Sequence, residues 1–388
     1  MLERKIQLTY SHRVAFTRGA FSAGNSTIAD LVAECEDAPP HRVAVFIDHG
    51  LVKDDESLLA TIEGYFETHR ELFQLGLEPC VLPGGEACKS EWSFVPSLWE
   101  AIDEAGLDRH SFVFVIGGGA ILDLVGFAAA TAHRGIRLVR FPTTTLSQGD
   151  GGVGVKNGVN FLGKKNWVGS FAVPFAVVND FDFLESLPAS VRREGIIEAI
   201  KVSLIRDAGF FAWISENVEA LARLDAGTLE TLIRRSAELH VDHIASCGDP
   251  FELGSARPLD FGHWAAHRLE QISNFELSHG GAVAIGMAVD LVYSRRAGIL
   301  DAGSCGRILD LVEQIGFATY SPHLHAVEDG RLAVLRGLED FREHLGGELT
   351  VTLIPEIGQK LEVHDVEEAK VVEAMAELRE RAEEVKIG

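Results

Sequence analysis

The hydrophobic pattern changes character near the middle of the chain, and this change constrains the fold more than any other feature. In the first half, apolar runs at 43–47, 112–116 and 136–141 alternate with segments of helical spacing, such as 56–72. Strands that alternate with helices are typical of βαβ units, in which helices cover both faces of a parallel sheet. From about Pro188 onward helical spacing prevails almost throughout. We therefore expect an α/β domain followed by a mainly helical domain.

The length of 388 residues favours two or three domains. We place the boundary between an α/β domain, 1–182, and a mainly helical domain, 183–388. Within the second domain we expect one strand at 348–354 and an acidic, solvated helix at 367–385. A cleft between two domains is the expected place for a functional site.

The chain is strongly acidic, with 58 acidic and 35 basic residues and a formal net charge of −23. Such a charge repels phosphate backbones and anionic lipid, which excludes nucleic-acid and membrane-surface roles. The first ten residues lack the apolar core of a signal peptide, and no apolar stretch is long enough for a membrane span. The five scattered cysteines form no C-x-x-C pair. The sequence therefore predicts a cytoplasmic protein without a disulfide scaffold.

A glycine-rich turn, Gly117-Gly118-Gly119, lies between a predicted strand and a predicted helix. Glycines let the backbone approach a pyrophosphate, and a helix N-terminus offers free N–H groups. The spacing is not G-x-G-x-x-G, so a plain tight turn is the alternative. Asp48, just after another strand, could hold a ribose hydroxyl, although a turn-capping Asp is the alternative there.

Two further segments carry chemistry. Residues 150–160 and 163–166 are rich in lysine and asparagine. We interpret this segment as a flexible loop able to surround a phosphate monoester. A mobile surface loop without function is the alternative.

His263 and His267 are four residues apart on a predicted helix, and His279 and Glu198 could join them in a catalytic zinc-type set. Spacing alone does not say which two histidines bind metal.

Six ordered segments together resemble the signature blocks of 3-dehydroquinate synthase, of the sugar phosphate cyclase superfamily. The matching segments are 117–123, 142–156, 165–166, 198–201, 261–267 and 279–280. The resemblance implies a dehydroquinate synthase-like fold, with a Rossmann-like α/β domain that binds NAD and an all-α C-terminal domain that binds metal and substrate.

The resemblance also implies roles for individual residues. The metal, zinc or cobalt, falls to Glu198, His263 and His279. Catalytic and substrate contacts fall to Asp150, Lys156, Lys201, His267, Lys165 and Asn166. NAD contacts fall to Asp48, Glu86, Lys89, Gly118, Gly119, Asp123, Thr143, Thr144 and Ser186. Arg134 matches an arginine that reaches the phosphate in the neighbouring subunit, which implies a homodimer.

The family mechanism implied by the resemblance involves no net redox change. NAD takes a hydride from a ring carbinol whose hydroxyls are held by the metal, which makes the oxygen a better acid. The ketone so formed acidifies the adjacent C–H, and phosphate leaves by elimination. NADH then returns the hydride, the ring opens, and an intramolecular aldol reaction closes the carbocycle.

Among the departures from the 3-dehydroquinate pattern, three bear directly on the substrate. His240 stands at the position of a lysine and Ala256 at that of an arginine, and both family residues bind the substrate carboxylate; Asp260 replaces an asparagine. An arginine clamp on carboxylate is hard to replace, and an added Asp would repel the anion. We therefore expect a neutral-headed C7 sugar phosphate such as sedoheptulose 7-phosphate, the substrate of the 2-epi-5-epi-valiolone synthases. Retention of His267 is not typical of that branch.

Three other interpretations stay open. If Arg257 turns inward, the substrate is the carboxylate-bearing 3-deoxy-arabino-heptulosonate 7-phosphate and the enzyme is a 3-dehydroquinate synthase. NAD- and metal-dependent polyol dehydrogenases resemble the same two-domain architecture but lack the phosphate-holding lysines. A binding protein without activity would tolerate loss of Glu198 and His263.

Overall fold

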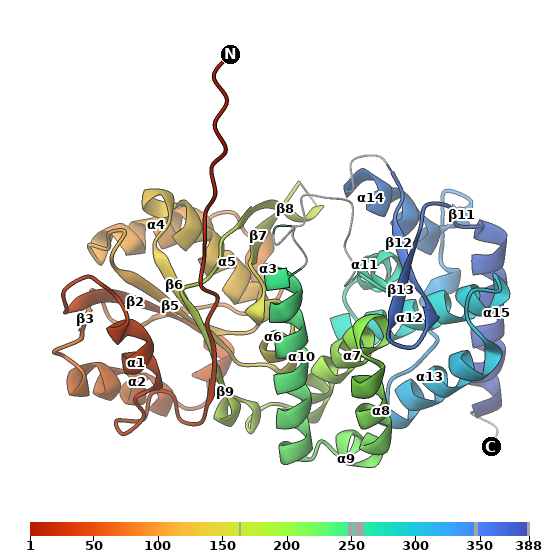
Figure 1. The fold of residues 1–388 in the computed structure, drawn as a ribbon, viewed down its shortest axis with the longest axis horizontal. Coiled ribbons are helices and arrows are strands. Elements are labelled where there is room, and N and C mark those ends of the chain that lie inside the picture. The colour runs from red at the N-terminus through yellow and green to blue at the C-terminus, as the bar shows by residue number, and fades with distance from the viewer. Residues whose placement is uncertain (163, 247–250, 252–259, 345–347, 386–388) are drawn as a thin grey trace. The chain divides into compact units, whose positions relative to one another are not determined.

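The computed structural model describes residues 1–162, 164–246, 251, 260–344 and 348–385 (Figure 1). The chain divides into two compact units, residues 1–187 and 188–388. Among the described residues, no helix combines the length and apolarity needed to cross a membrane.

A seven-stranded sheet, in which every pairing is parallel, forms the centre of the N-terminal unit. Its order is β1 (Val14–Thr17), β9 (Ala176–Asp180), β6 (Arg137–Pro142), β5 (Phe112–Gly117), β2 (His41–Asp48) and β3 (Phe73–Leu75), and β4 (Cys80–Leu82) also pairs with β2. The chain runs outward from β2 to β3 and β4 and then returns to β5. The strand order thus reverses between β2 and β5, and in open α/β sheets ligands bind at the carboxyl ends of strands flanking such a reversal.

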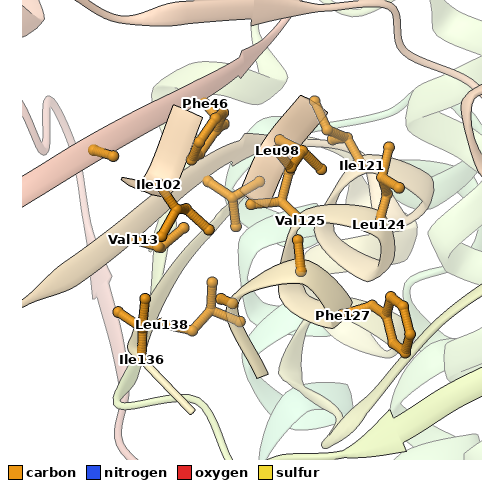
Figure 2. Packing of buried hydrophobic residues seen from close by; sticks show 14 of the residues in the cluster. Phe46, Leu98, Ile102, Val113, Ile121, Leu124, Val125, Phe127, Ile136 and Leu138 are labelled. Carbon is orange, nitrogen blue, oxygen red and sulfur yellow. The ribbon is translucent and has the colours of Figure 1, made fainter. Parts of the chain in front are cut away.

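Helices cover both faces of this sheet, as the alternating pattern predicts. They are α1 (Thr27–Ala33), α2 (Ser57–Thr68), α3 (Ala87–Ser90), α4 (Phe94–Glu104), α5 (Gly119–Thr131) and α6 (Thr145–Gly149). Strand β5 divides its side chains between two buried clusters, because successive residues point to opposite faces. Val113 packs with α4 and α5, where Figure 2 shows Leu98, Ile102 and Val125. Phe114 packs on the other face, in the cluster that includes Ile62 of α2.

An antiparallel hairpin, β7 (Lys156–Phe161) and β8 (Lys164–Phe171), occupies the segment that we expected to be a flexible loop. That expectation is wrong for these residues. The physical reason is burial on one face of β7, where Asn157 and Val159 are buried and Val159 joins the cluster beneath α5. Because the segment is mostly polar, this short alternation of buried and exposed side chains was not apparent from the sequence.

The C-terminal unit is mainly helical, which confirms the predicted fold class. Its helices are α7 (Ala189–Arg206), α8 (Ala208–Glu216), α9 (Val218–Ala222), α10 (Ala226–Ser246), α11 (His263–Ile272), α12 (His279–Arg296), α13 (Ala302–Ile315), α14 (Arg336–His344) and α15 (Glu368–Val385). Two small antiparallel pairs accompany them, β10 (Val327–Glu328) with β11 (Arg331–Leu332), and β12 (Val351–Glu356) with β13 (Gln359–Val363). Helix α12 is buried along almost its whole length and packs against α7, α11 and α15. A helix that is apolar all round is typical of a core position.

Candidate active site

Three helices of the C-terminal unit bring Glu198, His263 and His279 together. Glu198 lies on α7, His263 is the first residue of α11, and His279 is the first residue of α12. One possible ligand atom from each lies within 4.8 Å of the others, and Glu198 Oε1 is 3.5 Å from His279 Nε2 and 3.9 Å from His263 Nε2. This grouping selects His263 and His279 from the three histidines that spacing alone could not separate.

The donor set fits a divalent metal. Two imidazole nitrogens and one carboxylate are a protein ligand set typical of catalytic zinc sites. His263 Nδ1 lies 3.1 Å from the carbonyl of Phe261; an N–H donated there leaves the Nε2 lone pair on the side of Glu198. Burial and the neighbouring Lys201 lower the pKa of His263, which favours the neutral imidazole that binds metals.

Close packing of α11 on α12 sets the positions of the two histidines. Gly262 adopts φ +78°, and a Cβ there would lie 2.5 Å from the backbone nitrogen of Met287. Asp290 of α12 accepts hydrogen bonds from Gly262 N at 3.0 Å and Trp264 Nε1 at 2.8 Å. Burial raises the pKa of Asp290 to about 7. Asp290 was not predicted from the sequence, although an ionisable residue inside the apolar stretch 282–292 was the available signal.

Another residue missed from the sequence is Glu270, on α11. Its Oε1 lies 3.3 Å from His279 Nδ1, and Glu270 is buried. A carboxylate behind the second ring nitrogen of a metal-binding histidine orients the ring and makes it a stronger ligand. Its spacing of seven residues from His263, two helical turns, could have placed it on the same face of α11.

The other predicted residues of this unit surround the same group to different degrees. The ring of His267 is centred 5.4 Å from that of His263, and the Lys201 amine contacts the carboxylate of Glu198. The carbonyl of Asp260 accepts the backbone N–H of His263 at 3.0 Å, and the Asp260 charge acts to raise the pKa of His263. His240 is half-buried on α10. Arg257 and Ala256 lie outside the described residues.

In the N-terminal unit, predicted NAD contacts lie where the strand order reverses. Asp48 ends β2, Gly117 ends β5, Gly118 is the N-cap of α5, and Gly119 begins this helix. A Cβ at Gly84 would collide with the Asp48 carboxylate, so this glycine permits a close approach of backbone to side chain. Asp48 also accepts the N–H of Gly50 at 2.8 Å, which is the turn-capping alternative. A Cβ at Gly119 would meet nothing within 4 Å, so there is open space beside the helix start.

A buried lysine lies between two carboxylates at the same edge. Lys89 is 3% exposed; its Nζ lies 2.7 Å from Asp123 Oδ2 and 4.0 Å from Glu86 Oε1. Burial acts to lower the pKa of Lys89, but the two carboxylates outweigh it and the pKa is raised. Asn160 of β7 donates to Glu86 at 3.0 Å, which ties the hairpin to these residues.

The loop after β6 supplies two predicted threonines. Thr143 N donates to the carbonyl of Gly117 at 3.0 Å, and Thr144 caps α6 in a reciprocal capping box with Ser147. Ser186 is exposed in the segment after β9, where its hydroxyl lies 3.5 Å from the carbonyl of Phe183.

The predicted phosphate-holding residues lie on or beside the hairpin. Asp150 is the C-cap of α6, and Lys156 begins β7 with an exposed side chain. Asn166 adopts φ +53°, and its backbone N–H donates to Asn160 Oδ1 at 2.8 Å. Lys165, beside it, is half-buried.

Arg134 lies apart from the hairpin, in the turn that joins α5 to β6. His133 and Arg134 are exposed and take φ values of +49° and +64°. Two consecutive left-handed non-glycine residues are costly, and such strain clusters at functional positions.

Comparison with known proteins agrees with this geometry. Family models described as 3-dehydroquinate synthase N-terminal and C-terminal match residues 79–194 and 195–331. The 3-dehydroquinate synthase of Bordetella pertussis is 40% identical over 72% of this chain and 76% of its own length. A 2-epi-5-epi-valiolone synthase of Streptomyces glaucescens is 35% identical over 80% of this chain and 77% of its own length.

A solved structure is similar over almost the whole chain. It is the 2-epi-5-epi-valiolone synthase of Streptomyces hygroscopicus subsp. jinggangensis 5008 with NAD+ and Zn2+ bound, with a TM-score of 0.85 and 28% identity over 98% of this chain and all of its own. Given these matches and the Glu198–His263–His279 group, the chain belongs to the 3-dehydroquinate synthase-like sugar phosphate cyclases and is a lyase of that type.

Proposed function

We propose that this chain is an NAD- and divalent-metal-dependent cyclase for a neutral-headed C7 ketose phosphate, such as sedoheptulose 7-phosphate, which it converts to a carbocycle with loss of phosphate. The choice of substrate rests on the position of Asp260 beside His263. Its carbonyl holds the N–H of His263, and its charge acts on that metal-ligand histidine.

An acidic side chain there discriminates between the two candidate substrates. A carboxylate on the substrate would meet a like charge beside the metal ligands, which costs affinity. A hydroxyl at the same place can instead donate a hydrogen bond to Asp260. His240, where the family has a lysine, removes a permanent positive charge that would attract the substrate carboxylate.

The cofactors divide between the two units. NAD would be held by the residues at the carboxyl ends of β2 and β5, and the metal by Glu198, His263 and His279. When bound, NAD supplies reversible hydride acceptance and the metal makes a substrate hydroxyl more acidic.

The chain's own groups would then handle the phosphate and the protons. Lys156, Lys165 and Asn166 hold the leaving phosphate by charge and hydrogen bonds. Lys201 and His267, beside the metal ligands, orient the substrate hydroxyls. The exposed, strained Arg134 supports a homodimer in which it reaches the partner's substrate phosphate.

The second candidate is a 3-dehydroquinate synthase acting on 3-deoxy-arabino-heptulosonate 7-phosphate. The 40% identity to the Bordetella pertussis enzyme favours it. It requires a cationic partner for the substrate carboxylate, and Arg257 is the residue to test for that role. A polyol dehydrogenase, the alternative from another class, would release no phosphate.

The test is release of inorganic phosphate by the purified protein with NAD and zinc or cobalt. Each of the two C7 substrates is offered separately, with Glu198→Ala as the blank. Release from sedoheptulose 7-phosphate alone supports the proposal. Release from the carboxylate substrate alone contradicts it and makes Arg257→Ala the next variant.

A substitution at Asp260 sharpens this test. We expect Asp260→Asn to lower activity on the ketose and to raise the relative activity on the carboxylate substrate, because it removes the repelling charge. An unchanged ratio of kcat/KM values for the two substrates would contradict the role given to Asp260.

A further inference from the structure

A fully buried arginine lies beneath the segment that carries the predicted phosphate-holding residues. Arg140, on β6, is 0% exposed. It donates from Nη1 to the carbonyls of Gly152 at 3.2 Å and Gly154 at 2.9 Å, and from Nη2 to the carbonyl of Lys156 at 2.8 Å and to Asn157 Oδ1 at 2.6 Å. All four acceptors are neutral oxygens of the single segment 152–157.

A charge in this position is costly, so its retention needs a reason. Burial lowers the pKa of Arg140, but a guanidinium stays charged in proteins. Removing it from water costs several kcal/mol unless hydrogen bonds replace the lost hydration. The four hydrogen bonds give that replacement, and they couple the charge to the geometry of one stretch of backbone.

The hydrogen-bond partners alternate along this segment, which leaves a 3-10 turn, Gly151–Val153, and enters β7 at Lys156. The carbonyls of residues 152, 154 and 156 accept from Arg140, whereas the carbonyls of 153 and 155 have other partners. Val153 O lies 2.7 Å from His12 Nε2, and Val155 O accepts from Ala172 N at 2.9 Å. The backbone is therefore held from both sides. The Lys156 side chain is exposed while its carbonyl points to the buried guanidinium.

Asn157 extends this arrangement to α5. A Cβ at Gly126 of α5 would collide with Asn157 Oδ1, the same atom that accepts from Arg140. The Asn157 side chain is thus confined between the guanidinium and the helix whose N-terminus carries Gly118 and Gly119.

We propose that Arg140 is a positioning residue for the phosphate-holding segment: its guanidinium holds residues 152–157 so that Lys156, and Asp150 just before them, keep the placement the substrate phosphate needs. The inference rests on the proposed function of Lys156 and Asp150. Arg140 itself is buried beneath the segment and touches no substrate. Its sequence signal is an arginine between Val139 and Phe141, within a run, 136–141, that also contains Arg137.

The experiment compares Arg140→Met with wild type and with Arg42→Met. The control changes an exposed arginine of the same sheet, which donates to the carbonyl of Gly106 at 3.0 Å. Three quantities are measured: amide hydrogen exchange by mass spectrometry, the dissociation constant for inorganic phosphate, and kcat/KM with the active sugar phosphate. NAD affinity and metal content are measured alongside.

In Arg140→Met we expect faster exchange confined to amides 150–158 and weaker phosphate binding. We expect kcat/KM to fall about 100-fold, the scale of a misplacement of about 1 Å. NAD affinity and metal content should stay those of wild type. Gly126→Ala, which displaces Asn157 from the other side, should give the same local exchange pattern with a smaller loss. If Arg140→Met does not fold, Arg140→Lys replaces it, because one amine cannot reproduce four hydrogen bonds.

Two results would overturn the proposal: exchange at 150–158 and phosphate affinity equal to wild type, or exchange that rises throughout residues 1–187, which is general destabilisation. The proposed function fails in a different way. If wild-type protein binds no phosphate and releases none from either sugar, the function is wrong, and the positioning role falls with it. If phosphate binds but neither sugar reacts, exchange and phosphate affinity still decide the role of Arg140.

Discussion

The two units build their groups of candidate site residues by opposite means. At the sheet edge of the N-terminal unit, the geometry comes from the backbone: Gly84 lets the chain approach Asp48, and Gly119 leaves open space at the start of α5. In the C-terminal unit, side chains from three helices converge, and Asp290 and Gly262 set the helix packing behind them. Added atoms should therefore damage the first region most, and removed donor atoms the second.

The largest effect should follow loss of a metal donor. Glu198→Ala should lower kcat by about 1,000-fold, equivalent to about 4 kcal/mol at 1.36 kcal/mol per tenfold, because the metal supplies several kcal/mol of charge stabilisation. Metal content measured by atomic emission should fall, while NAD affinity measured by fluorescence quenching stays. A variant that retains both metal and activity would remove Glu198 from the ligand set.

Removing the carboxylate behind His279 should have a smaller effect on the same region. We expect Glu270→Gln to weaken zinc binding by about 10- to 100-fold, because the ring loses its orienting carboxylate. Competition with a chromogenic chelator measures this constant without substrate. Glu276→Gln, an exposed position near the end of α11, is the matched control. Equal zinc affinity in both variants would show that Glu270 does not act on the metal.

In the N-terminal unit an added methyl group should suffice to disturb cofactor binding. Gly84→Ala places a Cβ against the Asp48 carboxylate, so backbone or carboxylate must move, and we expect NAD affinity to fall about tenfold, or about 1.4 kcal/mol. Gly64→Ala is the control, because a Cβ there meets nothing within 4 Å and a mid-helix alanine is favourable. Zinc affinity should be the same in both. If Gly84→Ala binds NAD with the same affinity as wild type, the close approach of Gly84 to Asp48 does not determine NAD binding.

The last effect concerns stability and pH in the C-terminal unit. The pKa of Asp290 rises from 3.8 in the unfolded chain to about 7 when folded, so between these values the native state binds the extra proton. The free energy of unfolding should therefore fall as pH rises from about 4 to about 7, by up to about 1.4 kcal/mol per pH unit. Above about pH 7 the contribution is lost and the slope ends.

Asp290→Asn should remove this slope. The free energy of unfolding of the variant should therefore increase relative to that of wild type as pH rises from 5 to 7. Urea unfolding at several pH values, with a chelator present, measures it. Asp54→Asn at an exposed position is the control. A parallel pH dependence in Asp290→Asn and wild type would contradict the buried, proton-binding carboxyl.

Much of the N-terminal fold was predictable from the chain. The strands β2, β5 and β6 and the helix α5 came from apolar runs that end at glycine or at polar residues. The short strands β1, β3 and β9 were missed, because three to five residues carry little periodicity and depend on neighbours for their pairing. The hairpin was missed because its burial is confined to one face and to few side chains, above all Val159.

The candidate site residues were likewise predictable only in part. The residue types of the metal group, the glycine-rich turn and the lysine-rich segment are features of the chain, and so is the resemblance to the sugar phosphate cyclases. Which histidines meet Glu198, and what holds them, depends on how α7, α11 and α12 pack. Spacing along one helix determines only which side chains share a face; it says nothing about the atoms that another helix brings to that face.

The sequence by itself therefore determined the fold class, the family and the types of residue at the candidate site. Local hydrophobic periodicity and the order of motifs are properties of the linear sequence. Only the tertiary structure decided the Glu198–His263–His279 group, the Asp290 anchor and the clamp of Arg140 on residues 152–157. Each of these depends on distances of about 3–5 Å between residues far apart in the chain, and such distances arise only when buried surfaces pack together.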